Sequence, residues 1–498
     1  MAHSATTDPT GPIADSVGPD VLDTPEAGPR AIRGAGMRVS SYFAGALLGL
    51  VSAPLLTRHL GTVGFGQYYT VVALVALVGG VTEGGLGAVG VREYTVLAGA
   101  DRARFMRNLL GMRLTFACVG VAGALVFAFL AGYQSILVQG TAVAGCGLVV
   151  AVAQATLAVP LSAGLLFGRQ MLTDFLAQVL TVSLVVAGVL VGAGILPFLA
   201  VPIPTGLALL ALTVVFVRGR TPVRPAFELS QWRRALRETY PIAAATAVQT
   251  LYIRSVILVL SLVSVPLQTG TYAYSVRIME ILTGIPVLLV STTFPVLARA
   301  ARDDRTRLSY ALQRIFEIAV LGGVWMTLCT VIGAHLALSV IAGAKGAAAV
   351  PVLRVQAVAL LLAFLSASAS TALMALRRSR ALLVSSAVAV ATTVVLAFAL
   401  VPGQGALGGG IASVGGEAAL LFTMGLALVR GDQLRLTFGV VPRVLLAAGL
   451  GFAAAGIPAL PDIARLVLFT IVYATVLGLT GAVPVELRHA TLDRLRRH

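Results

Sequence analysis

The sequence predicts an all-α integral membrane protein with about fourteen transmembrane helices. Of its 498 residues, 58% are apolar and only 11% are charged, and the mean hydropathy is +0.95. A soluble globular chain carries about 25% charged residues. This chain therefore has too few polar side chains to cover its own surface, and lipid must serve as its solvent.

Each predicted span follows from the bilayer thickness, because a membrane helix needs about 20 apolar residues to cross the hydrocarbon core. The apolar stretches of suitable length predict helices over 38–57, 67–89, 109–130, 138–160, 173–194, 197–217, 241–263, 271–296, 312–335, 349–374, 381–402, 405–429, 441–460 and 463–483.

The positions of the basic residues support this count independently. With the N-terminus in the cytoplasm, alternate loops and both tails hold 29 of the 36 lysines and arginines. Arginines within three residues of a predicted span boundary are counted with the adjoining loop. The opposite loops then hold only Arg58, Lys345 and Arg465, and four arginines, 113, 254, 277 and 354, lie deeper inside spans. Cytoplasmic loops are enriched in basic residues, so this alternation predicts a multi-pass plasma-membrane protein with both termini in the cytoplasm. It also accounts for the net charge of +16 without nucleic-acid binding.

Motifs for catalysis are absent from the sequence. There is no phosphate-binding Walker loop, no H-E-x-x-H pair and no G-x-S-x-G turn, and the five histidines are scattered. The three cysteines fall inside apolar stretches without metal-ligand spacing. We therefore expect no enzyme activity, no cofactor and no metal site.

Two short motifs suggest an internal repeat. Gly66-Gln67-Tyr68 precedes the second span, and Gly270-Thr271-Tyr272 precedes the eighth. Both predicted halves start from the cytoplasm, so the pattern predicts a parallel repeat about an axis along the membrane normal. Between the halves, residues 228–238 have the pattern of an amphipathic helix lying on the inner leaflet.

Four stretches resemble one protein family in their order along the chain. They read PLLTRHLGTVGFG at 54–66, EGGLG at 83–87 before VRE at 91–93, TGTYAYSVRIMEILTGIPVLLVSTTFPVLAR at 269–299, and VPGQGALGGGIASVGGE at 401–417. This order resembles the polysaccharide flippases, the Wzx-type branch of the multidrug/oligosaccharidyl-lipid/polysaccharide exporters, over roughly residues 38–430.

The resemblance implies two six-helix lobes around a central cavity, two additional C-terminal helices and transport by alternating access. It implies that the substrate is a lipid-linked oligosaccharide. It also implies that membrane lipid, a polysaccharide polymerase and glycosyltransferases are partners of the protein. The predicted domains are a disordered cytoplasmic tail at 1–37, an N-lobe at 38–217, a cytoplasmic linker at 218–240, a C-lobe at 241–430, and two helices with a cytoplasmic tail at 431–498.

Charged residues inside the spans are the candidate substrate-binding groups, because each costs about 2.5–3.5 kcal/mol on insertion scales and usually faces a wet interior. The deepest is Arg254, whose forked guanidinium matches the oxygens of a pyrophosphate. The other reading of Arg254 is a structural ion pair with Glu83, Glu280 or Glu417. The remaining candidates are Arg277 with Glu280 at i+3, Arg113, which lies within reach of the inner interface, Glu83 and Glu417.

Three functions stay open at this point. The first is flipping of a polyprenyl-diphosphate-linked oligosaccharide to the outer leaflet for cell-surface polysaccharide biosynthesis. The second is another transporter on the same fold, either a lipid II flippase or a small-molecule or drug antiporter. The third is a membrane scaffold in a glycan-assembly complex. An anionic headgroup favours arginine in the cavity, whereas a cationic drug favours carboxylate.

Overall fold

The computed structural model describes residues 27–482 apart from 165, 219–223, 304, 433–436 and 458–459, and every regular element in this part of the chain is helical. The helices are α1 (Ala27–Glu83), α2 (Leu86–Val96), α3 (Gly99–Leu130), α4 (Ser135–Leu157), α5 (Val159–Ala163), α6 (Phe167–Leu190), α7 (Ile195–Ala200), α8 (Pro202–Val217), α9 (Leu229–Val263), α10 (Pro266–Asp303), α11 (Arg305–Ile332), α12 (Ala334–Ala342), the 3-10 helix η2 (Gly343–Ala349), α13 (Val350–Ala375), α14 (Ser379–Asp432), α15 (Val441–Ala455) and α16 (Asp462–Leu479).

Two of the longest helices are each broken into two spans by a glycine. In α1 the backbone of Gly61 has φ +67°, and in α14 that of Gly405 has φ +56°. These values lie in a region that L side chains avoid, so glycine permits the chain to reverse direction there. Each of these two helices also contains a proline a few residues before its break, namely Pro54 in α1 and Pro402 in α14.

The prediction of about fourteen membrane-spanning helices is confirmed. Among the described residues, ten helices are long and apolar enough to cross a membrane, and α15 is a shorter apolar helix. With α1 and α14 divided at their glycines, and with α10 included, the described helices account for every predicted span.

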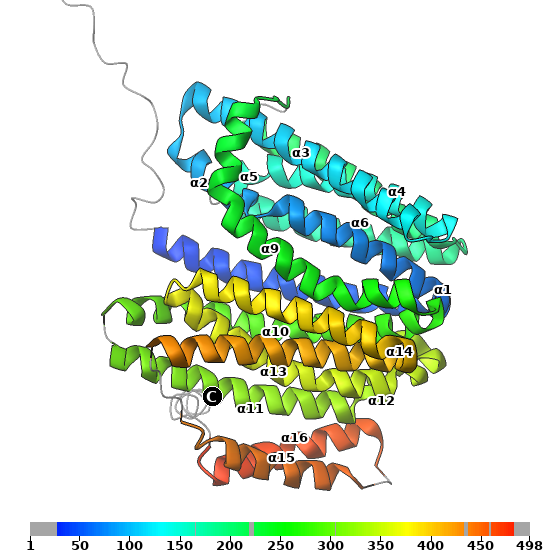
Figure 1. The fold of residues 1–498 in the computed structure, drawn as a ribbon, viewed down its shortest axis with the longest axis vertical. Coiled ribbons are helices and arrows are strands. Elements are labelled where there is room, and N and C mark those ends of the chain that lie inside the picture. The colour runs from blue at the N-terminus through cyan, green and yellow to red at the C-terminus, as the bar shows by residue number, and fades with distance from the viewer. Residues whose placement is uncertain are drawn as a thin grey trace, which may run out of the picture.

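Several helices begin earlier than the hydropathy pattern predicts. The structure starts α3 at Gly99 instead of 109 and α9 at Leu229 instead of 241, because polar turns extend the helices beyond their apolar spans. The amphipathic segment predicted at 228–238 is the first part of α9, and Figure 1 shows it running across the direction of the neighbouring helices. Of the predicted tails, residues 1–26 and 483–498 lie outside the described residues.

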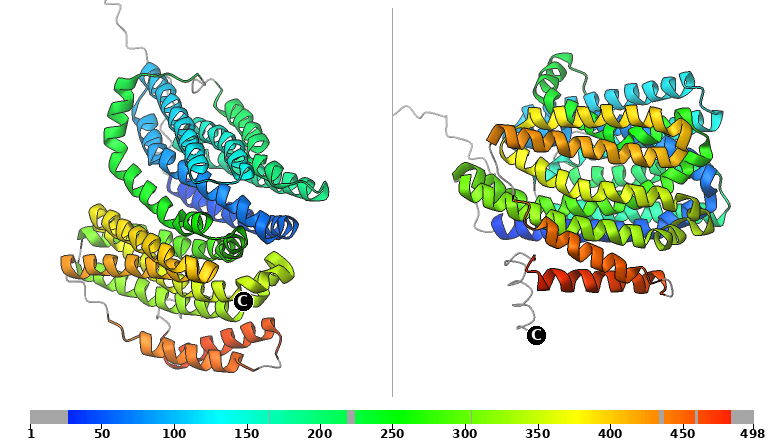
Figure 2. Two further views of the ribbon diagram at one scale, coloured as in Figure 1. Left: turned by 45° about the vertical axis from the view of Figure 1, so that its right-hand side comes forward. Right: turned by 60° about the horizontal axis from the view of Figure 1, so that its bottom comes forward.

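The helices form two bundles, with α15 and α16 as a separate pair at one edge (Figures 1 and 2). We call α1–α8 the first bundle and α9–α14 the second. Helix α1 packs on α9, α10 and α12, so it is the main contact between the bundles, while α15 and α16 pack on α11. The largest apolar core extends across this contact and includes Phe65, Leu260 and Tyr274.

Candidate functional site

The two bundles are joined by polar contacts at the end where α9 turns into α10. Tyr133, after α3, and Ser261 of α9 share a hydrogen bond of 2.6 Å between their hydroxyl oxygens. The guanidinium of Arg58 donates to the backbone carbonyls of Ser339 and Val340, at 3.0 and 2.7 Å. The sequence predicts that these connections face the periplasm, so the bundles meet on the predicted outer side.

The repeated glycine motif lies at the centre of this contact. A Cβ atom added to Gly66 of α1 would lie 2.6 Å from the backbone nitrogen of Gly270 in α10, so neither position has room for a side chain. Beside them the rings of Phe65 and Tyr274 stack with 5.3 Å between centroids. The two copies of the motif therefore allow the backbones of α1 and α10 to touch, as small residues do between membrane helices.

Deeper along the same helices, the structure brings three of the predicted site residues together. Arg254 of α9 donates from Nη1 to Glu280 Oε1 of α10 at 2.7 Å. Arg277 donates from Nη1 to the other carboxylate oxygen, Oε2, at 3.3 Å. Two arginines thus share one carboxylate, and the cluster of Arg254, Arg277 and Glu280 carries a net charge of +1. We call these three residues the arginine cluster.

The arginine cluster is partly accessible and is not sealed in the core. The side chains of Arg254, Glu280 and Arg277 are 20%, 26% and 35% exposed. Arg254 lies nine residues before the end of α9 at Val263, which is about 14 Å along the helix and close to half of the hydrocarbon thickness. The only group of the first bundle that hydrogen-bonds to Arg254 in the described part of the chain is Tyr69 OH, at 3.4 Å.

The structure pairs Arg113 with Glu83 in the first bundle. Arg113 of α3 donates to the carboxylate of Glu83 at the end of α1, and the Arg113 side chain is only 2% exposed while that of Glu83 is 50% exposed. The expectation that Arg113 reaches the inner interface is therefore wrong, because its side chain is buried and pairs with Glu83, as a buried charge needs a partner. Only Glu83 of this pair offers an accessible surface.

Glu417 stands apart from the arginine cluster. Its carboxylate accepts a hydrogen bond of 2.5 Å from the hydroxyl of Tyr252, which joins α14 to α9. In the described ranges, no hydrogen bond or ion pair connects Glu417 with Arg254 or Arg113. The six predicted residues therefore form three separate groups, one in the first bundle at Arg113 and Glu83 and two in the second bundle.

Two tyrosines complete these groups, and sequence reasoning did not select either one. Tyr69 contacts Arg254, and Tyr252 contacts Glu417. Tyr69 directly follows the Gly66-Gln67-Tyr68 motif, so the sequence could have identified it as a candidate site residue. No feature of the sequence distinguishes Tyr252. Within the described residues, no group of three or more histidine, cysteine, aspartate or glutamate side chains could hold a metal ion.

Comparison with known proteins gives the fold and the family. The structure is similar to that of the lipid II flippase MurJ in an inward closed conformation, with a TM-score of 0.73 and 13% identity over 89% of this chain and 98% of MurJ. It is also similar to an inward-facing MATE family multidrug resistance transporter of the MOP superfamily, with a TM-score of 0.60 and 15% identity over 80% of this chain and 98% of the transporter.

At the level of sequence, no curated protein matches the chain. Residues 31–301, more than half of the chain, match the family described as polysaccharide biosynthesis protein. The predicted resemblance is confirmed: the chain belongs to this polysaccharide biosynthesis family, and its fold is similar to the folds of MurJ and of the MATE transporter.

Proposed function

We propose that the protein flips a polyprenyl-diphosphate-linked oligosaccharide from the cytoplasmic to the outer leaflet of the plasma membrane by alternating access. The observation that carries this proposal is the arginine cluster, in which two guanidiniums share one carboxylate near mid-membrane depth. A diphosphate needs fixed positive charge at that depth, where an uncompensated ion is costly. A site for cationic drugs would instead need an excess of carboxylate.

The shared carboxylate gives Arg254 a ready way to exchange partners. Arg254 and Arg277 each use Nη1 toward Glu280, which leaves other N–H groups of both guanidiniums available to phosphate oxygens. A diphosphate that draws Arg254 away does not leave Glu280 alone, since Arg277 remains beside it. Binding therefore costs less than breaking an isolated buried ion pair.

The other polar groups have roles in the same cycle. Glu83, held by the buried Arg113, presents an accessible carboxylate that accepts hydrogen bonds from sugar hydroxyls. Glu417, with Tyr252, offers a second acceptor in the other bundle.

The polar contacts at Tyr133 and Arg58 close the predicted periplasmic side and must open for release. Both termini lie in the cytoplasm, where a glycosyltransferase supplies the substrate, and a polysaccharide polymerase uses the flipped product outside.

Lipid II is the second candidate substrate. The structural similarity to the MurJ flippase covers nearly all of that protein. Lipid II carries the same polyprenyl diphosphate, so the arginine cluster suits both substrates, and only the groups that contact the sugar distinguish them. Membership of the polysaccharide biosynthesis family favours the oligosaccharide.

Binding of defined lipids to the purified protein tests the proposal. Native mass spectrometry should show that a polyprenyl-diphosphate-linked sugar stays bound at concentrations where the same sugar on polyprenyl monophosphate and a cationic drug do not. Arg254→Gln should reduce the preference for diphosphate over monophosphate. Equal retention of monophosphate and diphosphate lipids by the unchanged protein would contradict a diphosphate site.

A further inference from the structure

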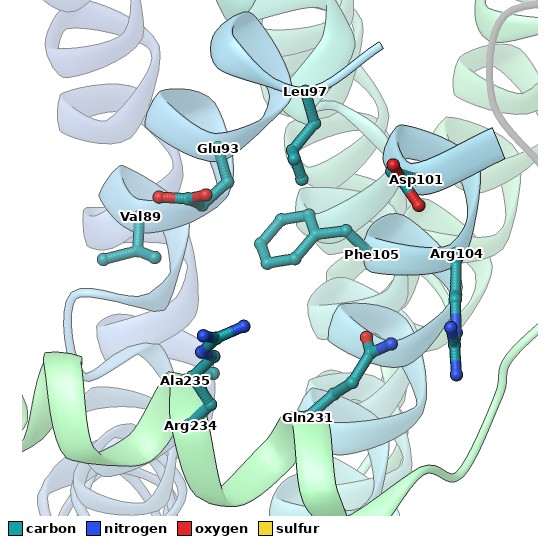
Figure 3. Close-up of a pocket in the computed structure, with 9 residues that line it drawn as sticks. All are labelled: Val89, Glu93, Leu97, Asp101, Arg104, Phe105, Gln231, Arg234 and Ala235. Carbon is teal, nitrogen blue, oxygen red and sulfur yellow. The ribbon is translucent and has the colours of Figure 1, made fainter. Parts of the chain in front are cut away.

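A pocket separate from the arginine cluster lies where α2, the first turns of α3 and the first turns of α9 meet (Figure 3). Its volume is about 280 Å³, which suits a small polar headgroup better than a whole drug-sized ligand. None of the residues of the arginine cluster lines it. The pocket therefore plays no part in the diphosphate site proposed above.

Opposite charges face each other across this pocket. Glu93 of α2 and Asp101 of α3 lie on one side, while Gln231 and Arg234 of α9 lie on the other, with Phe105 between them (Figure 3). In the described part of the chain, no ion pair or hydrogen bond links Arg234 to either carboxylate. Arg234 and Asp101 are exposed, and an ion pair between exposed groups contributes only about 0–1 kcal/mol.

The neighbouring ion pairs leave these groups available. Arg92 binds the Oε1 atom of Glu93 at 2.7 Å, so Oε2 keeps its acceptor capacity. Arg104, which also lines the pocket, is held by three hydrogen bonds of 2.5–3.1 Å to the carboxylate of Glu228. The pocket is thus left with a carboxylate side at Glu93 and Asp101 and a guanidinium side at Arg234.

Exposed apolar side chains occur on the same helix ends that form the pocket. Val96, one residue before the lining residue Leu97, and Leu229, two residues before the lining residue Gln231, are 75% and 76% exposed. The arginine pattern places this end of the molecule at the cytoplasmic face. A ligand that reaches the pocket from the inner leaflet has a polar head and an apolar tail.

We propose that this pocket binds the headgroup of a phospholipid that carries both a phosphate and a primary ammonium, as phosphatidylethanolamine does. Its phosphate lies against Arg234 and Gln231, and its ammonium donates to Glu93 and Asp101. A choline headgroup has no N–H to donate, and a glycerol headgroup has no positive charge. The bound lipid would fasten the first turns of α9 to α2 and α3, and α9 is the helix that carries Arg254 further along.

Lipid titration of the delipidated, purified protein tests this inference without any transport measurement. Native mass spectrometry would compare phosphatidylethanolamine, phosphatidylcholine and phosphatidylglycerol with identical acyl chains. The expected order places phosphatidylethanolamine first. Arg234→Gln and Asp101→Asn should each weaken its binding about tenfold, the loss expected for one charged hydrogen bond.

Arg233→Gln is the matched control, because Arg233 lies on the same helix, is exposed and does not line the pocket. It should leave the preference for phosphatidylethanolamine unchanged, and all variants should keep the thermal stability of the parent protein in detergent. Equal binding of the three lipids, strongest binding of phosphatidylglycerol, or an unchanged preference in both pocket variants would overturn the proposal. Soluble phosphoethanolamine that competes as well as the lipid would show that no membrane lipid is needed, and would overturn it as well.

Discussion

Replacing Arg254 with glutamine should stop transport while leaving the protein folded. In the parent protein Arg254 lies 2.7 Å from Glu280, and Arg277 lies 3.3 Å from the same carboxylate. The variant therefore retains a partner for Glu280. Because the pair is also partly exposed, we expect a loss of about 1–2 kcal/mol in the free energy of unfolding, against about 3–5 kcal/mol for a carboxylate left alone.

The expected effect on transport is much larger. A hydrogen bond between charged groups contributes about 1.5–3 kcal/mol, and a guanidinium can give two of them to a phosphate. Their loss raises the barrier by about 3–6 kcal/mol, which slows flipping about 10²- to 10⁴-fold. Arg254→Lys should recover only part of the rate, because an ammonium lacks the planar fork of guanidinium.

The assay pairs two measurements on each purified variant, namely flipping of a fluorescent lipid-linked sugar in proteoliposomes and thermal unfolding in detergent. The double variant Arg254→Gln/Arg277→Gln is the informative control, because it removes both arginines from Glu280 and should destabilise the protein by more than the two single losses together. A stable Arg254→Gln protein that transports at the parent rate would refute the assignment of Arg254 to the substrate site.

Three further predictions concern the surrounding structure. Gly270→Val should prevent α1 and α10 from touching, so that spin labels placed at residues 133 and 261 lie further apart in the variant than in the parent background. Tyr252→Phe removes the donor to a partly buried carboxylate and should lower the free energy of unfolding by about 1–3 kcal/mol, and changing Glu417 to Gln as well should restore part of that loss; thermal unfolding of the three proteins checks this. Hydrogen bonding to Arg104 lowers the pKa of Glu228 from its ordinary value of 4.5, so its stabilising effect is complete near pH 7 and is lost as the pH falls through the lowered pKa. The difference in melting temperature between the parent and Glu228→Gln should therefore be constant above about pH 5.5 and shrink at lower pH, and a difference that grows on acidification would contradict this reasoning.

The membrane spans could be predicted from the sequence because the bilayer imposes one length on every crossing helix. The early starts of α3 and α9 could not, because hydropathy detects only the apolar part of a helix. The repeat of the motif at Gly66 and Gly270 could be seen in the sequence, but the structural role of the two glycines could not be predicted from it. Only the structure shows that the two glycines contact each other across the bundles.

The candidate site was predictable as a set of residues but not as a set of pairs. The cost of an intramembrane charge singled out Arg254 and Arg113 and named three possible carboxylate partners. Sequence spacing fixes neighbours on one helix, such as Arg277 and Glu280, but does not determine which faces of different helices meet. The pairing of Arg254 with Glu280, rather than with Glu83 or Glu417, therefore required the three-dimensional arrangement.

Flux through one set of proteoliposomes tests the central proposal most directly. Vesicles containing the purified protein would be loaded in parallel with a polyprenyl-diphosphate-linked oligosaccharide, lipid II and a cationic dye. Membrane-impermeant enzymes that cleave the lipid-linked sugars would report the first two, and dye efflux the third. We expect the oligosaccharide lipid to cross fastest, at a rate well above that in protein-free vesicles, and the dye not to move. Efflux of the dye without movement of either diphosphate lipid would contradict the proposed function.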